Sequence, residues 1–206
     1  MKKIIIYSIT ILMILGCNIC GIAQTTPPRQ LNISILLDLS DRINPQIHPN
    51  IVPAHAERDI EIIKYITEYF KTNMVNLTAW NAKGKIRVFF SPPPSNPRIN
   101  DIAAKLNIDC SILKNPDRKD VYDNITNLFA QKLTEIYNQT IQRSGWEGCD
   151  IWRFFKDDVR DYCIESNTNY RNILIILTDG YIFHPQSMNQ NANRYAYLLG
   201  ERNVQQ

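Results

Sequence analysis

Two runs rich in Ile and Leu predict buried strands, one early and one late in the chain. The first covers residues 31–39, and the second covers residues 173–177, which are five apolar residues in a row. Strands that are covered on both faces have near-continuous apolar sequences, whereas half-exposed strands alternate. We therefore expect both runs to be fully buried strands of a mostly parallel sheet.

Helical spacing of apolar residues predicts several helices between these strands. Residues 57–71 form an amphipathic pattern, and Asn115-Pro116-Asp117 opens a longer helix that reaches about residue 141. Shorter helices are expected at residues 101–106, at 150–162 and near 193–200. The helix at 150–162 carries a stripe that we interpret as core packing: Trp152, Phe155, Val159 and Tyr162.

A hairpin is predicted in the middle of the chain. Residues 74–80 and 85–90 are rich in β-forming side chains, and the short polar segment Asn81-Ala82-Lys83-Gly84 separates them. Helices that alternate with apolar strands favour a sheet that is covered on both faces. The expected fold is therefore α/β, doubly wound and mostly parallel, with one antiparallel edge strand.

The N-terminal segment predicts export. Lys2 and Lys3 precede the largely apolar residues 4–15, which are too few for a permanent membrane span. Two forms are compatible with the residues that follow: a signal of residues 1–16 with a lipidated Cys17, or a signal peptide of residues 1–23 with cleavage before Gln24. A linker at residues 24–30 and one domain at 31–206 follow. We expect a periplasmic protein or a surface lipoprotein whose membrane contact, if any, is the lipid.

Charge and cysteine content exclude few classes of function. The chain has 23 basic and 20 acidic residues, a formal net charge of +3, and no basic block, so nucleic acid is not an expected partner. Three cysteines follow the signal segment: Cys110, Cys149 and Cys163. An exported protein can oxidise a pair of them, but a continuous helix between Cys149 and Cys163 would hold these two apart. His48 and His55 lie in a proline-rich loop and are interpreted as surface residues.

Carboxylates follow both predicted buried strands. The first strand ends in Asp38-Leu39-Ser40-Asp41-Arg42, and the last ends in Thr178-Asp179-Gly180. In an open parallel sheet, ligands bind beyond the carboxyl ends of the strands, where the strand order changes direction. The two segments are therefore expected to meet and to form the functional site.

These two segments resemble the von Willebrand factor A (VWA) family. In that family a D-x-S-x-S turn after the first strand, a Thr from a middle loop and a T-D-G-type turn after the fourth strand form a metal-ion-dependent adhesion site. The resemblance implies that Asp38, Ser40 and Asp179 are metal ligands, with Thr178 and Gly180 completing the second turn. Oxygen ligands of this kind suit a hydrated Mg²⁺ ion, which would leave a position for a partner's carboxylate.

The sequence departs from the family pattern at two points. Arg42 stands where the motif has its second Ser, and no Thr can be assigned to the middle loop. If Arg42 folds inward among Asp38, Asp41 and Asp179, its charge takes the role of the ion, so we expect Mg²⁺ binding to be weak or absent. Only 26 residues follow Gly180. The domain is therefore expected to be truncated or to be completed by another chain.

The leading functional hypothesis is a binding module for another protein rather than an enzyme. One alternative is a structural or degenerate envelope protein without a ligand. Another is a phosphohydrolase of the haloacid dehalogenase type with Asp38 as nucleophile, although Ser40 stands where that class usually has a second acid. A nucleophilic Ser40 lacks the surrounding G-x-S-x-G elbow.

Overall fold

The computed structural model describes residues 28–78, 80–143, 145–180 and 184, together with the backbone of two short strands, β5 (Gln190–Asn191) and β6 (Arg194–Tyr195). The predicted signal segment, Cys17 and Gln24 lie outside these residues. The helix predicted near 193–200 is wrong at Arg194–Tyr195, which pair with β5 as a strand. Within the described residues, no helix is both long and apolar enough to cross a membrane.

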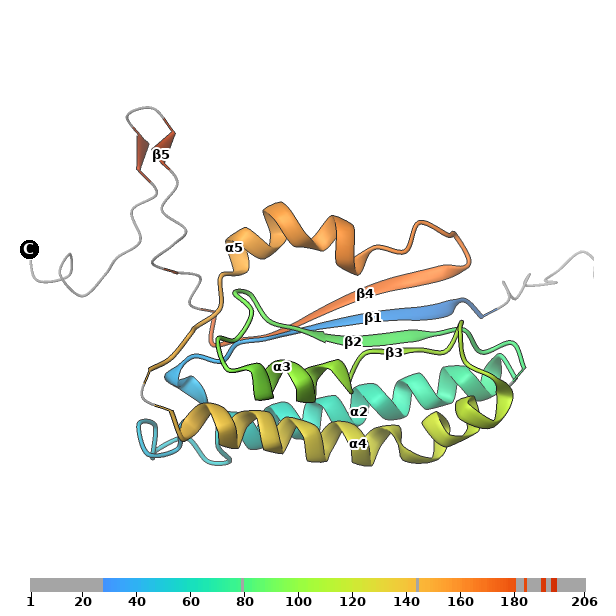
Figure 1. Cartoon of the computed structure of the whole chain (residues 1–206), viewed down its shortest axis with the longest axis horizontal. Coiled ribbons are helices and arrows are strands. Elements are labelled where there is room, and N and C mark those ends of the chain that lie inside the picture. Colours follow the sequence, from blue (N-terminus) through green and yellow to red (C-terminus); the bar gives the residue numbers. More distant parts are fainter. Residues whose placement is uncertain are drawn as a thin grey trace, which may run out of the picture.

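A four-stranded sheet with the order β3-β2-β1-β4 forms the centre of the fold (Figure 1). β1 (Gln30–Leu37) is paired in parallel with β2 (Lys85–Phe89) on one side and with β4 (Tyr170–Leu177) on the other. The short edge strand β3 (Ile108–Asp109) is antiparallel to β2. The predicted mostly parallel sheet with one antiparallel edge strand is therefore confirmed.

Helices lie on both sides of this sheet (Figure 1). α2 (His55–Asn76), α3 (Pro97–Ala104) and α4 (Asn115–Ile141) lie on one side, and α4 has the predicted bounds. The other side carries α5 (Ile151–Arg153), which continues directly into the π-helix η2 (Phe154–Cys163). A 3₁₀ turn, η1 (Asp41–Ile43), follows β1. The α/β, doubly wound arrangement expected from the sequence is thus present.

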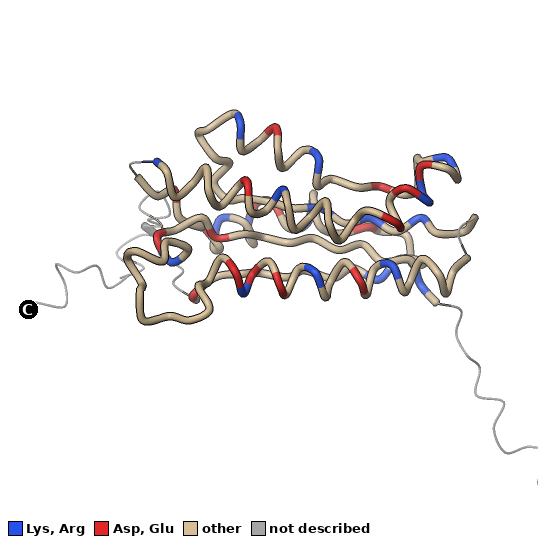
Figure 2. The backbone as a smooth tube through the Cα atoms, turned by 90° about the horizontal axis from the view of Figure 1, so that it is seen from below, with Lys and Arg blue, Asp and Glu red and all other residues tan. Residues whose placement is uncertain are grey.

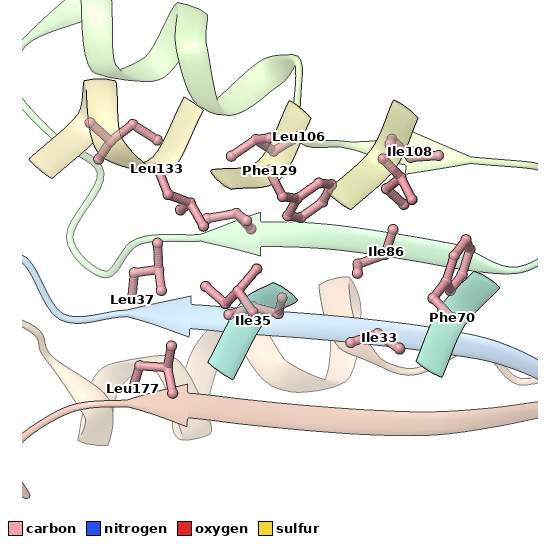
Figure 3. Close-up of a cluster of buried hydrophobic side chains, with 14 of the residues drawn as sticks. Ile33, Ile35, Leu37, Phe70, Ile86, Leu106, Ile108, Phe129, Leu133 and Leu177 are labelled. Atoms are coloured by element: carbon pink, nitrogen blue, oxygen red, sulfur yellow. The ribbon is translucent and has the colours of Figure 1, made fainter. Parts of the chain in front are cut away.

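The central strand β1 contributes to two cores because its side chains alternate between the two faces of the sheet. Ile33, Ile35 and Leu37 point toward the α2 and α4 side, where they meet Phe70 and Phe129 (Figure 3). Leu36 faces the other side, in a smaller cluster with these residues: Cys149, Ile151, Phe154 and Cys163. Burial on both faces is accompanied by an Ile- and Leu-rich sequence in β1, with Asn32 and Ser34 as buried polar exceptions.

One polar side chain, Asn32, connects β1 to three neighbouring elements. It is fully buried, and its Nδ2 donates to the Cys163 carbonyl at 2.9 Å and to Asn172 Oδ1 at 2.7 Å. Its Oδ1 accepts from Arg87 Nη2 at 3.0 Å. Asn32 therefore links the end of the π-helix, β2 and β4 to the central strand, and its buried amide group is satisfied on both sides.

The predicted hairpin is wrong, although its second strand, residues 85–90, is present as β2. Residues 74–76 form the last turn of α2, where Met74 is buried, and the antiparallel edge strand is β3 instead. The segment between α2 and β2 approaches the core so closely that a Cβ atom at Gly84 would lie 2.7 Å from the ring of Phe70. Residues 74–80 are rich in β-forming side chains, but residues 74–76 extend α2 because this face of the helix is buried. That long-range packing is not visible in a local sequence pattern.

The aromatic stripe of residues 152–162 also differs from expectation. Trp152, Phe155 and Tyr162 are 56%, 51% and 55% exposed, and Ile151, Phe154 and Cys163 are the buried residues. The cause is the π-helix, in which i→i+5 hydrogen bonds widen the turn and change which residues share a face. The prediction of core packing, made with α-helical spacing, is therefore wrong for Trp152, Phe155 and Tyr162, whereas Val159 is partly buried and packs against the smaller core cluster.

Two further expectations concern β4 and the cysteines. β4 was expected to be fully buried, but residues 173–176 are only partly buried, because among the described strands β4 has a neighbour on one side only, β1. Cys110, Cys149 and Cys163 are free, buried thiols. That Cys149 and Cys163 do not bridge each other stays a prediction.

Candidate functional site

The carboxyl ends of β1 and β4 meet as the strand pattern predicted. The backbone N–H of Asp38, the residue after β1, donates to the carbonyl of Leu177 at the end of β4 at 3.1 Å. This bond places the Asp38 segment beside the Thr178 segment. Because β2 and β4 flank β1 on opposite sides, the site lies at the point where the strand order changes direction.

Asp38 holds these two segments together. Its carboxylate is 2% exposed; Oδ1 accepts from the backbone N–H of Ser40 at 2.8 Å, and Oδ2 accepts from the Thr178 hydroxyl at 3.0 Å. The Nε atom of Arg42 lies 3.6 Å from the same Oδ2. Both oxygens of Asp38 are therefore occupied by protein groups, as a buried carboxylate requires.

Arg42 folds into the interior, which is the orientation expected to disfavour a metal ion. Its side chain is 3% exposed, and Nη2 donates to Asp59 Oδ2 at 2.6 Å and to the Leu177 carbonyl at 2.8 Å. Burial acts to lower the pKa of Arg42, but the hydrogen bond and charge of Asp59 act in the opposite direction, and the pKa is raised. Arg42 is therefore a permanent cation between two buried carboxylates, Asp38 and Asp59.

Asp59 and Tyr137 complete this network, and sequence reasoning missed both. Asp59 lies in the second turn of α2, and the Tyr137 hydroxyl of α4 donates to its Oδ2 at 2.8 Å. Burial, together with the charge of Asp59, raises the pKa of Tyr137 well above its ordinary value, so the phenol stays protonated. The available signal was that Asp59 occupies the same helical face as Ile63 and Phe70, where an acid is unusual.

The remaining predicted site residues surround this network. Asp41 and Asp179 are exposed, as is Gly180, whose φ of 86° suits a glycine and whose N–H donates to the Thr178 hydroxyl at 3.1 Å. The Oγ atom of Ser40 is buried and has no hydrogen-bond partner among the described atoms. We name Ser40, Asp41, Thr178, Asp179 and Gly180 the rim of the site.

The arrangement fits an internal guanidinium better than a divalent cation. A Mg²⁺ ion needs free carboxylate oxygens, yet both oxygens of Asp38 are engaged and the positive charge of Arg42 lies beside them. Ser40 Oγ, which has no partner among the atoms that the structure describes, is one remaining oxygen. Within the described residues, no group of three or more His, Cys, Asp or Glu side chains is placed to hold a metal ion. A cation here would have to displace Arg42.

Comparisons with known proteins return no match, whether the chain is compared with protein-family models, with curated proteins or with solved structures. A buried, hydrogen-bonded Asp38 is poorly placed for nucleophilic attack, because its oxygens are neither exposed nor available. The arrangement can support a rigid rim at which a second molecule binds.

Proposed function

We propose that this chain is an exported, VWA-like binding module that recognises another protein through its rim and carries Arg42 in place of a metal ion. The observation behind this proposal is the buried Arg42 guanidinium between Asp38 and Asp59. Support also comes from the sheet order, with a central β1 and one antiparallel edge strand. Export, by lipidation of Cys17 or by cleavage before Gln24, is part of the same proposal.

The internal cation changes which partner the rim suits. In a metal-dependent site the ion presents positive charge to the partner's carboxylate, whereas the Arg42 guanidinium is directed inward and is 3% exposed. The exposed acidic residues at the rim are Asp41 and Asp179. We therefore propose a partner that presents a basic or hydrogen-bond-donating group, and binding that does not require Mg²⁺.

The first experiment is calorimetric titration of the full chain with Mg²⁺ and with Mn²⁺. No tight binding is expected in the unmodified protein. The variant Arg42→Ser combined with Asp59→Asn restores the motif's hydroxyl and removes the carboxylate left without its cation, and it is expected to gain metal affinity. Arg58→Ser, an exposed change nearby on α2, is the matched control. Tight binding by the unmodified protein would overturn the proposed role of Arg42.

The second experiment tests the rim. Envelope extracts are passed over the immobilised full chain with and without a chelator, and captured proteins are compared with those retained by an Asp41→Lys, Asp179→Lys variant. Retention that persists in chelator and is lost in the variant supports metal-independent recognition. Equal retention by both proteins would show that the rim is not the binding surface, and retention lost in chelator would contradict the internal cation.

A further inference from the structure

The outer edge of β4 combines an apolar sequence with an open position in the sheet. Residues 173–177 are all Ile or Leu, but residues 173–176 are only partly buried. Among the described strands, β4 has a partner on one side only, β1. An exposed, apolar edge strand readily pairs with another strand, and proteins usually protect such an edge with charges, prolines or a covering element.

The face of α2 beside this edge is apolar as well. Ile62, Tyr65 and Tyr69 are 43%, 76% and 49% exposed and follow one another at helical spacing. With Ile173 and Ile175 of β4 they line a continuous groove between the helix and the strand. A groove of this composition, rather than a scatter of single apolar residues, is typical of an interaction surface.

The two ends of this groove carry different charges. Toward the N-terminal end of α2, an adjoining pocket that shares Ile62 and Tyr65 with the groove is lined by Glu57, Glu61 and Arg58. Toward the other end, a second adjoining pocket that shares Tyr69 is lined by two cations, Arg29 and Arg171, and by no acid. The groove is thus apolar in the middle, with carboxylates near one end and guanidinium groups near the other.

We propose that this face binds a second copy of the chain, with β4 antiparallel to the β4 of the second copy and the two α2 helices side by side. The pattern is self-complementary about its centre. Tyr65 lies at the middle of α2 (His55–Asn76), and Ile62 and Tyr69 flank it at similar spacing. A two-fold axis there places Tyr65 against its own copy and Ile62 against the Tyr69 of the second copy.

The charges favour this occupant over an unrelated strand. A two-fold axis perpendicular to the sheet reverses the groove, so the Arg29 and Arg171 end of each copy meets the Glu57 and Glu61 end of the other. The same axis joins the two four-stranded sheets through their β4 edges. The two copies would then present their sites at opposite ends of the joined sheet, so the dimer would be bivalent.

Sedimentation velocity of the full chain in a mild detergent tests the proposal. A concentration-dependent dimer is expected, and Tyr65→Glu should weaken it at least tenfold, because a charge would lie on the two-fold axis. The matched control is Tyr162→Glu, another exposed tyrosine (55%, against 76% for Tyr65), on the π-helix across the sheet, and it should leave the dimer intact. Far-UV circular dichroism confirms that both variants fold.

A charge reversal checks the orientation. Arg171→Glu should weaken the dimer, and adding Glu61→Arg in the same chain should restore it, since only the antiparallel arrangement brings these positions together. A monomer at every concentration would overturn the proposal, and protection of β4 amides from exchange in that monomer would assign the groove to another segment of the same chain. A dimer lost in Tyr162→Glu but kept in Tyr65→Glu would place the interface on the π-helix instead.

Discussion

Two cations in this protein each lie between two carboxylates, one at each end of the sheet. Arg42 contacts Asp38 and Asp59, and these side chains are 3%, 2% and 7% exposed. Lys85 contacts Asp109 and Glu165, with side chains 19%, 27% and 29% exposed. The composition of the two clusters is similar, so the main difference between them is depth.

Depth determines what each cluster does for the fold. In the interior, removal of one partner leaves the other charge desolvated and uncompensated. The loss of any member of a buried cluster therefore strongly destabilises the fold. Near the surface, solvent and salt screen the same pairs, and each contributes little to stability. The Arg42 network therefore holds β1, β4 and α2 together, whereas the Lys85 cluster contributes little to stability. The following predictions test that distinction.

The largest effect is expected for Arg42→Met. This change leaves Asp38 and Asp59 buried without their cation, and removal of one partner of a buried pair costs about 3–5 kcal/mol. Urea unfolding of variant and unmodified protein measures the loss in the free energy of unfolding. A loss below about 1 kcal/mol would indicate that solvent reaches the network and would remove the contrast with Lys85.

A smaller loss is expected for Tyr137→Phe, which removes the hydroxyl that donates to Asp59 but keeps the ring. Hydrogen bonds to charged groups contribute about 1.5–3 kcal/mol, and Asp59 retains its bond to Arg42. The same variant has a pH signature. The raised pKa keeps Tyr137 protonated in the folded protein, while the unfolded chain releases this proton near pH 10, so unfolding is favoured above that pH.

The alkaline signature is measured by urea unfolding between pH 8 and pH 11. The unmodified protein should lose stability above about pH 10, and Tyr137→Phe should lose less over the same range. An identical decline in both proteins would assign the effect to other groups, such as Cys149, whose pKa burial raises to about 12.

For Lys85→Met the expected loss is about 1 kcal/mol or less, because the cluster is partly exposed. The hydrogen bond from Lys85 lowers the pKa of Glu165. That stabilisation is present above the ordinary glutamate pKa and disappears as the pH falls through the lowered value. The difference between variant and unmodified protein should therefore shrink in acid and in high salt, as monitored by thermal unfolding. A constant difference would mean that packing, not charge, is responsible.

The smallest effect is expected at Ser40. Its buried Oγ has no hydrogen-bond partner among the described atoms, so Ser40→Ala should change the free energy of unfolding by no more than about 0.5 kcal/mol. Thermal unfolding in chelator and in Mg²⁺ gives the comparison. A clear loss, above all one seen only with Mg²⁺ present, would show that this hydroxyl is engaged and would contradict the metal-free site.

Local patterns predicted α2, α4 and the central strand because burial along one element leaves a periodic trace in its sequence. They failed to predict the burial of β4, which is apolar but has only one neighbour among the described strands. The sequence of a strand does not show how many strands will lie beside it. Local patterns also failed at residues 74–76 and at the π-helix. In these two cases packing against distant residues, or a wider turn, changed the local preference.

The same limit applies to the site. Asp38 and Arg42 are four positions apart, so their proximity could be predicted from the sequence. Asp59 and Tyr137 are 78 positions apart and meet only because α2 packs against α4. No local spacing encodes the register between two helices, although an acid on an apolar helix face was a usable signal. The sequence thus predicted a counter-charge for Asp38 but not the second carboxylate and the phenol behind it.

The interior bonds of Asn32 have a dynamic consequence for the π-helix. Helix ends usually open first, because their last carbonyls lack partners within the helix. Here the carbonyl of Cys163, the final residue of the π-helix, accepts from a fully buried side chain of the central strand. Detaching that end would leave the Asn32 amide short of a partner inside the sheet. We therefore expect the amides at this end of the π-helix to exchange no faster than those of the central strand, and faster exchange there would contradict this coupling.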